Sequence, residues 1–315
     1  MTPPRSARRV RLGPVLRWLV LIAALVLAAV TVSERWDGVR ESLGRIGPGA
    51  VLVSVLAAAT AVTVSAEQQR ALLGAFGHRL PLATWLRVFW VAQLGKYVPG
   101  TAWAYVAQME LSRRSGVRRT TSVAVIALGA GLTVLTATVV AVPAVAAGRF
   151  HEVPGWLQWA LSCAGAAGLA VLVWRPDLVQ RAVSLVVAKV RRLDLSHLAF
   201  ASGGVRRAVG WSVLAWLAYG LHLWAVVRPL GMSGPGAAAL ALGTFALAWV
   251  CGFLFVIAPA GAGVREAVMV ALLSPELGPA SALAVALASR FLIMVAELLL
   301  TLAGLALRRQ EPSAQ

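Results

Sequence analysis

The sequence predicts an all-α polytopic membrane protein with about 7–8 transmembrane helices and with re-entrant or broken helices at 82–108 and 259–278. Of the 315 residues, 59% are hydrophobic, and the mean hydropathy is +0.80. Only 13% are charged, about half the share of a soluble domain. The charged residues gather in short runs between long apolar segments. This composition excludes a cytosolic globular enzyme, a disordered protein and a secreted disulfide scaffold.

The positive charge also indicates orientation. The net charge is +17 and the isoelectric point is near 11.7. Such a surplus can indicate nucleic-acid binding, but in a membrane protein it marks the loops that stay in the cytoplasm. We therefore expect anionic membrane lipids and no nucleic acid as partners. The basic residues of segment 1–13 predict a cytoplasmic N-terminus.

The first spans follow from apolar length, because about 20 apolar residues cross a bilayer. Residues 13–32 form a span that is too long for the apolar core of a cleaved signal peptide. Residues 34–48 carry balanced charge, which suits an external loop. Residues 49–66 return, and the charged group Glu67–Arg70 begins a cytoplasmic loop.

Segment 82–108 is apolar but is interrupted by glycine, lysine and proline. Arginines flank it on both sides, so we expect it to enter and leave the membrane on the cytoplasmic side. Broken backbone at that depth is tolerated only where it is buried in protein or faces water.

The next part divides the chain. Residues 121–147 and 154–174 read as a span and its return. The basic loop 175–208 contains an amphipathic stretch that predicts a helix at the membrane surface. This loop joins halves 14–174 and 209–307 of one membrane domain, 14–307.

The second half resembles the first in having one broken segment. Residues 209–227 and 237–258 are spans, and 281–307 is the last one before the tail 308–315. Residues 264–278 are expected to cross as a short half-helix, which brings the C-terminus to the cytoplasmic side.

Metal and redox chemistry are not indicated. Cys163 and Cys251 lie apart in apolar stretches, and the four histidines are scattered. No ligand spacing is present, so we expect no metal and no cofactor.

Charged residues inside apolar spans are costly unless they are paired or wet. Arg290 and Glu297 lie seven residues apart on one face of the last span. They are either structural partners of other helices or the lining of a headgroup pathway.

Two motifs are candidates for anion binding. In Gly95–Trp103, the breaks at Gly95, Pro99 and Gly100 unwind the backbone, Lys96 adds positive charge, and Tyr97 and Trp103 suit the headgroup level. A purely structural hairpin is the alternative. In the second motif, Pro259, Gly261 and Gly263 precede a helix start at which the helix dipole and Arg265 favour an anion, and Glu266 either pairs with Arg265 or caps the first turn. No strand precedes this motif, so it is not a dinucleotide-binding turn.

QLGKYVPGTAW, PAGAGVREAVMVALL and SRFLIMVAELLL resemble signatures of the lysylphosphatidylglycerol synthase transmembrane-region family, also called flippase-like or UPF0104 proteins. The resemblance extends over roughly residues 15–307. It implies a stand-alone flippase-like protein of the bacterial plasma membrane, because the aminoacyltransferase domain of larger members is absent.

We therefore expect a protein that moves or binds an anionic phospholipid or polyprenyl-linked headgroup, and not an enzyme. Two alternatives stay open. One is a membrane-embedded transferase that uses Glu67, Glu110 or Glu266, and the other is a scaffold that holds a lipid- or glycan-modifying enzyme.

Overall fold

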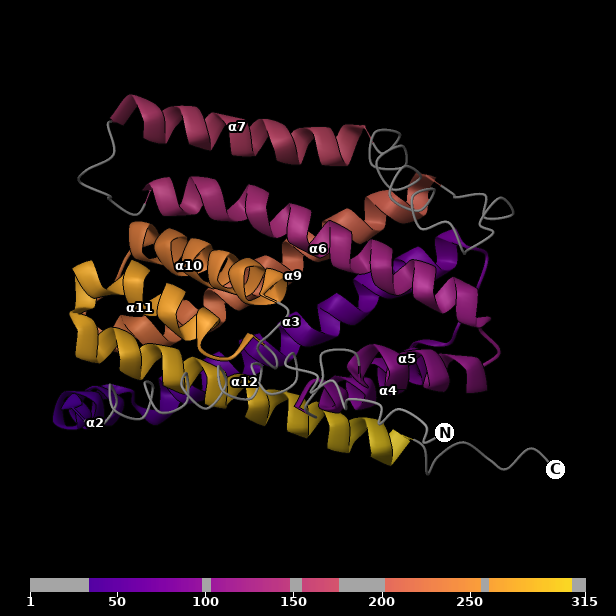
Figure 1. The fold of residues 1–315 in the computed structure, drawn as a ribbon, viewed down its shortest axis with the longest axis horizontal. Coiled ribbons are helices and arrows are strands. Elements are labelled where there is room, and N and C mark those ends of the chain that lie inside the picture. Colours follow the sequence, from indigo (N-terminus) through magenta and orange to yellow (C-terminus); the bar gives the residue numbers. More distant parts are fainter. Residues whose placement is uncertain (1–33, 98–102, 148–154, 176–201, 256–260, 308–315) are drawn as a thin grey trace, which may run out of the picture.

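The computed structural model describes residues 34–97, 103–147, 155–175, 202–255 and 261–307. In these residues the chain forms helices and no strand, and Figure 1 shows them packed side by side along one long axis. The protein is thus an all-α polytopic membrane protein, as predicted. The elements are α2 (Trp36–Arg45), α3 (Pro48–Ala75), α4 (Leu82–Gln93), the 3-10 helix η1 (Leu94–Tyr97), α5 (Trp103–Arg114), α6 (Arg119–Ala147), α7 (Gly155–Trp174), α9 (Ser202–Val227), the 3-10 helix η2 (Arg228–Leu230), α10 (Pro235–Leu254), α11 (Val264–Leu277) and α12 (Pro279–Leu307).

Five helical segments in the described residues are long and apolar enough to cross a membrane; they are 48–75, 119–141, 203–230, 235–254 and 279–307. Proline at the first position of α3, α10 and α12 favours these starts, because its fixed φ suits the first turn and the missing N–H needs no partner there. The span expected at 13–32 and the surface helix expected within 175–208 lie outside the described residues.

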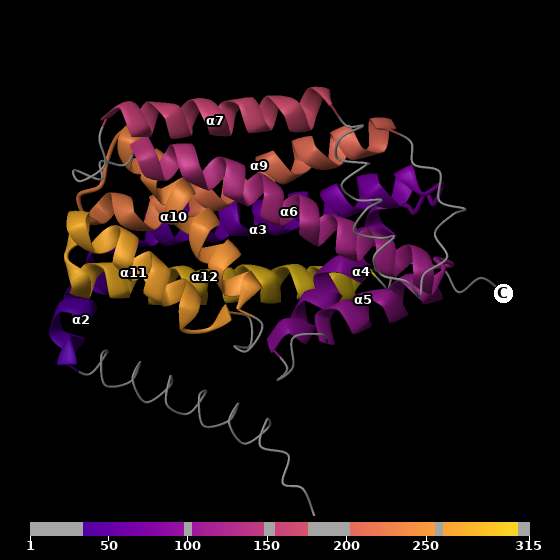
Figure 2. The ribbon, with the colours of Figure 1, turned by 45° about the horizontal axis from the view of Figure 1, so that its top comes forward.

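The order of the helices repeats with inverted direction. In Figures 1 and 2, α3 and α6 run in opposite directions, and the hairpin of α4, η1 and α5 comes between them in the chain. Likewise the hairpin of α10 and α11 comes between α9 and α12 in the chain. The first hairpin enters from one end of the bundle and the second from the other. We call α3 to α6 the first unit and α9 to α12 the second unit. The first helix of each hairpin packs on the last helix of the other unit: α4 packs on α12, and α10 packs on α6. In addition, α3 packs along α9.

One element differs from the expectation. Residues 264–278 were expected to complete a crossing, but α11 turns back to the end at which α10 begins. The short helix α2 marks this end, because it contacts both η2 and the start of α12. There the Ser42 hydroxyl donates to the Ser281 hydroxyl at 3.1 Å. With 14 residues, α11 is about 21 Å long. It lies against both α10 and α12, so it forms the second arm of the hairpin.

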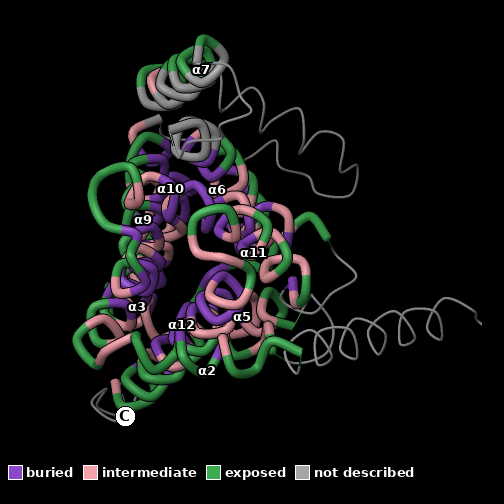
Figure 3. The backbone as a smooth tube through the Cα atoms, turned by 90° about the vertical axis from the view of Figure 1, so that its left-hand side faces the viewer, coloured by how far each residue is buried: buried purple, intermediate pink, exposed green. Residues whose placement is uncertain are grey.

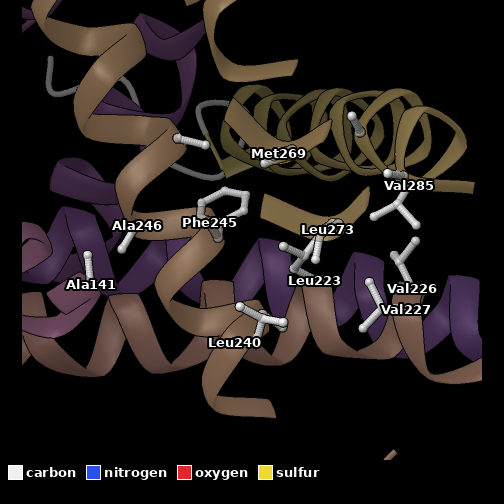
Figure 4. Close-up of a cluster of buried hydrophobic side chains, with 14 of the residues drawn as sticks. Ala141, Leu223, Val226, Val227, Leu240, Phe245, Ala246, Met269, Leu273 and Val285 are labelled. Carbon is white, nitrogen blue, oxygen red and sulfur yellow. The ribbon is translucent and has the colours of Figure 1, made fainter. Parts of the chain in front are cut away.

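The packed core lies between the two units, as the buried positions in Figure 3 show. Figure 4 shows the larger cluster, in which Leu223, Phe245 and Leu273 from α9, α10 and α11 meet. Large apolar side chains such as Leu56 and Leu302 are more than half exposed. A bilayer would cover these outward positions.

Candidate functional site

A cavity of about 500 Å³ lies between the described parts of the two hairpins. Its lining includes Lys96 and Tyr105 from the first hairpin, Gly252 and Arg265 from the second, and Glu297 from α12. The two broken segments singled out from the sequence, one in each half, therefore face the same space. Broken helices that meet inside a bundle are typical of transporter substrate sites.

Two neighbours on η1 hold Glu297. The Lys96 ammonium forms an ion pair with one carboxylate oxygen, and the Tyr97 hydroxyl donates to the other at 2.6 Å. The Glu297 side chain is only 2% exposed and that of Lys96 is 28% exposed. The buried carboxylate thus has a partner for each oxygen, and Lys96 keeps part of its surface toward the cavity.

Gly95 allows η1 to reach this position. A Cβ at Gly95 would lie 2.6 Å from the backbone nitrogen of Ala104, so η1 touches the first turns of α5 directly. A side chain there would separate the two arms of the hairpin and move Lys96. The glycine in this motif is required by close approach of backbones, not by a positive φ.

Glu266 fixes the start of α11. One oxygen accepts from the Gly263 N–H at 2.7 Å, and the other pairs with Arg290 of α12. Gly263 has φ +83° and Gly261 has φ +68°, a left-handed region in which glycine is favoured. The sequence left open whether Glu266 caps the first turn or pairs with Arg265. It caps the turn, and its ion pair is with Arg290.

Arg265 differs from the other charged residues of the site in its partners. Its guanidinium carbon is 5.7 Å from the centre of the Trp249 ring, and its buried Nε has no hydrogen-bond partner. No acid of the described residues forms a salt bridge with it. Since a buried polar group normally has a partner, the Arg265 guanidinium is the group in the lining most suited to receive an anion.

The sequence-predicted residues divide into three sets. Lys96, Tyr97 and Glu297 form one cluster, and Gly263, Glu266 and Arg290 form another. Arg265 and Gly261 line the cavity, whereas Trp103 at the start of α5 is about half exposed. Pro99, Gly100 and Pro259 lie outside the described residues.

Sequence reasoning missed the polar wall of the cavity. Four glutamine amides belong to it: Gln68, Gln69, Gln93 and Gln108. The first two were placed in a cytoplasmic loop, but α3 continues through them to Ala75. The Glu67–Arg70 ion pair joins two charges three residues apart on α3, which lowers the cost of extending the helix past Ala66. Polar amides within an otherwise apolar helix were the available signal.

Comparison with known families identifies the family of this chain. The profile of the family described as lysylphosphatidylglycerol synthase TM region matches residues 16–301. The matched range contains both hairpins and α12 as far as Thr301. A search of curated proteins finds no match. The profile covers far more than half of the chain, so this protein belongs to the lysylphosphatidylglycerol synthase TM region family.

Proposed function

We propose that this protein moves the anionic headgroup of a membrane lipid through the cavity between the two hairpins. The observation that carries the proposal is Arg265, a partly buried cation on the wall of an internal cavity, whose buried Nε has no hydrogen-bond partner and which forms no salt bridge with an acid of the described residues. A phosphate would supply the missing charge and the missing hydrogen-bond acceptor. Lys96 adds a second cation on the facing hairpin.

The inverted arrangement of the hairpins suits translocation. One hairpin reaches the cavity from each end of the bundle, so small movements of either tip would open the cavity toward a different side. The ion pairs Lys96–Glu297 and Glu266–Arg290 join these tips to α12. Breaking and reforming them is how we expect the tips to move.

The charge at the two ends supports the proposed orientation in the plasma membrane, in which the end where α3 stops faces the cytoplasm and the span expected at 13–32 returns the N-terminus to that side. At the end where α3 stops and α6 begins, basic residues outnumber Glu67 and Glu110; they are Arg70, Arg79, Arg87, Arg113, Arg114, Arg118, Arg119, Arg206 and Arg207. The opposite end is balanced, with Glu34, Arg35, Asp37, Arg40, Glu41, Arg45, Arg228 and Glu276. The positive-inside rule assigns the first end to the cytoplasm.

The transferase alternative receives less support from the acids that it would use. Glu67 is bonded to Arg70 through both oxygens, and Glu266 is held by Arg290. Hydrogen bonds from Arg113 hold the pKa of Glu110 at about 2. A general base works best with a pKa near the working pH, so Glu110 is a weak one.

The test is lipid flipping in proteoliposomes that contain acyl-chain-labelled phosphatidylglycerol, read by dithionite quenching of the label. We expect the purified protein to speed flipping relative to protein-free vesicles. Arg265→Gln should slow it by about ten-fold, the factor that matches one lost charge-assisted hydrogen bond. Arg206→Gln, at an exposed position on α9, is the matched control and should flip as the wild type does. An unchanged rate in Arg265→Gln would refute the proposed site.

A further inference from the structure

Apart from Lys96, Arg265 and Glu297, the polar side chains that line the cavity are neutral, and these neutral side chains form its polar wall. Besides the four glutamine amides it includes the hydroxyls of Ser65, Thr133 and Ser212. These side chains come from α3, α4, α5, α6 and α9, so several separate helices direct neutral donors and acceptors at one space. A site for a bare phosphate needs cations and N–H groups and has no use for amide carbonyls.

Part of this wall has no hydrogen-bond partner among the residues that the structure describes. The Gln68 amide donates to the Gly129 carbonyl at 3.2 Å and shares a hydrogen bond with Thr133. The Gln108 amide donates to the Gln69 carbonyl at 2.5 Å. Among the residues that the structure describes, this leaves the amide group of Gln69, the carbonyl of Gln108 and both groups of Gln93 without a hydrogen bond. The wall therefore offers donors and acceptors together, the combination that hydroxyl groups satisfy.

The charged residues that line the cavity argue against a cationic headgroup. Glu297 is the one acid among the described lining residues, and Lys96 and Tyr97 occupy both of its oxygens. An ammonium group in the cavity would meet Arg265 and Lys96 and would find no free carboxylate. Like charges at close range in a poorly solvated site repel each other strongly.

The wall on the side of α9 and α10 is aromatic. Tyr219 and Phe245 stack with centroids 4.7 Å apart, Trp249 and Phe253 stack at 4.9 Å, and Trp216 packs edge-on against Trp249. This packing holds the rings in place and gives the cavity a rigid apolar surface. Such a surface complements the C–H faces of a polyol, while the amides on the other wall complement its hydroxyls.

We propose that the cavity selects a lipid phosphate whose headgroup is an uncharged polyol, and that it disfavours an aminoacylated headgroup. The inference rests on the proposed function, since Arg265 supplies the phosphate contact. Two lipid sources share this chemistry: a glycerophospholipid with a glycerol or inositol headgroup, and a polyprenyl phosphate that carries a sugar.

The experiment measures the binding of four short-chain lipids to the purified full-length protein through the shift in its thermal unfolding midpoint, because a ligand that binds only the folded state stabilises it. The probes are phosphatidic acid, phosphatidylglycerol, a short prenyl phosphate bearing one hexose, and lysyl-phosphatidylglycerol. We expect the two polyol phosphates to bind about ten-fold more tightly than phosphatidic acid. The lysyl lipid should bind least.

Two variants separate the polyol contacts from the phosphate contact. Gln69→Leu with Gln93→Leu should remove the preference for the polyol lipids and leave the affinity for phosphatidic acid unchanged. Thr60→Val is the control for a polar-to-apolar change on α3, since Thr60 is exposed and bonds only to its own helix. Arg265→Gln should weaken all three anionic lipids together.

Each outcome bears on one claim. Equal binding of phosphatidic acid and both polyol lipids, or tightest binding of the lysyl lipid, would overturn the polyol inference while the Arg265 site stood. Anion binding that Arg265→Gln leaves unchanged would overturn the proposed function itself. A preference for the prenyl phosphate hexose over phosphatidylglycerol, or the reverse, identifies the source of the polyol and supports the inference in either case.

Discussion

Lys96 and Glu297 are 201 residues apart in the sequence and form an ion pair at the cavity between the hairpins. The pair joins η1, the 3-10 helix that follows α4 in the first hairpin, to α12, the last span of the chain. It buries the Glu297 carboxylate almost completely. The pair therefore holds η1 against α12.

Removing both partners of the pair should cost less stability than the sum of the two single losses. Glu297→Leu leaves the Lys96 charge and the Tyr97 hydroxyl without their acceptor, and we expect a loss of roughly 3 kcal/mol. That is the lower end for a broken buried pair, since Lys96 is partly exposed to the cavity. Lys96→Met should cost a similar amount because it leaves a buried carboxylate. The double variant Lys96→Met/Glu297→Leu should cost at least about 1 kcal/mol less than the sum of the singles. Thermal or denaturant unfolding in detergent measures all three, and additive losses would show that the pair is not coupled.

Glu266 has two roles that substitutions can separate. Glu266→Gln keeps an oxygen that can accept from the Gly263 N–H but weakens the pair with Arg290, whereas Glu266→Ala loses both contacts. We expect Glu266→Ala to be less stable than Glu266→Gln by about 1 kcal/mol, the usual contribution of a cap. Arg290→Ala should resemble Glu266→Gln. Hydrogen exchange of the amides in residues 263–267 reports the fraying, and it should rise most in Glu266→Ala. Ser274→Ala, near the other end of α11, is the control that should leave this exchange unchanged.

The residues with the clearest chemistry were predictable and their partners were not. Lys96, Arg290 and Glu297 stand out because a charge in an apolar segment needs a reason, which composition alone reveals. The pairing of Glu266 with Arg290 instead of adjacent Arg265 follows from helix geometry. Consecutive side chains on a helix point about 100° apart, so Glu266 faces α12 while Arg265 faces the cavity. That requires knowing which helices are neighbours, and sequence spacing does not supply it.

The direction of α11 and the length of α3 were missed for physical reasons of the same kind. A 14-residue helix fits either half a crossing or one arm of a hairpin, and only its contacts with α10 and α12 decide between them. The charges at Glu67 and Arg70 suggested a loop, yet their mutual ion pair lets α3 continue into the region that carries Gln68 and Gln69. Because Glu67 and Arg70 neutralise each other within α3, their charges misled the sequence analysis about Gln68 and Gln69, two of the four glutamines that line the cavity.

Backbone contact at Gly95 should make it intolerant of even one methyl group. In Gly95→Ala, the new Cβ would lie 2.6 Å from the Ala104 nitrogen, and backbone cannot move aside as a side chain does. We expect a loss of about 1–3 kcal/mol, typical of overpacking, together with slower lipid flipping. Gly131→Ala, on α6 with nothing within 4 Å of the new Cβ, is the matched control. It should be neutral or slightly stabilising, since alanine favours helix more than glycine does. Equal stability of the two variants would contradict the close contact between η1 and α5.

Cysteine labelling can distinguish a hairpin of α10 and α11 from an arrangement in which α11 crosses the membrane. The two native cysteines, exposed Cys163 and half-buried Cys251, are first replaced by alanine. Single cysteines are then placed at four exposed positions: Arg40, Arg118, Arg228 and Glu276. If α11 turns back, cysteines at Arg228 and Glu276, on either side of the hairpin, react with a membrane-impermeant maleimide from the same face as the one at Arg40. The cysteine at Arg118, at the arginine-rich end, should react only from the opposite face, which the positive-inside rule makes the cytoplasmic one.

Labelling of Glu276→Cys together with Arg118→Cys would mean that α11 crosses the membrane, and the inverted pair of hairpins would then be wrong. Labelling of Arg118→Cys from outside intact cells would instead reverse the orientation while leaving the hairpins in place.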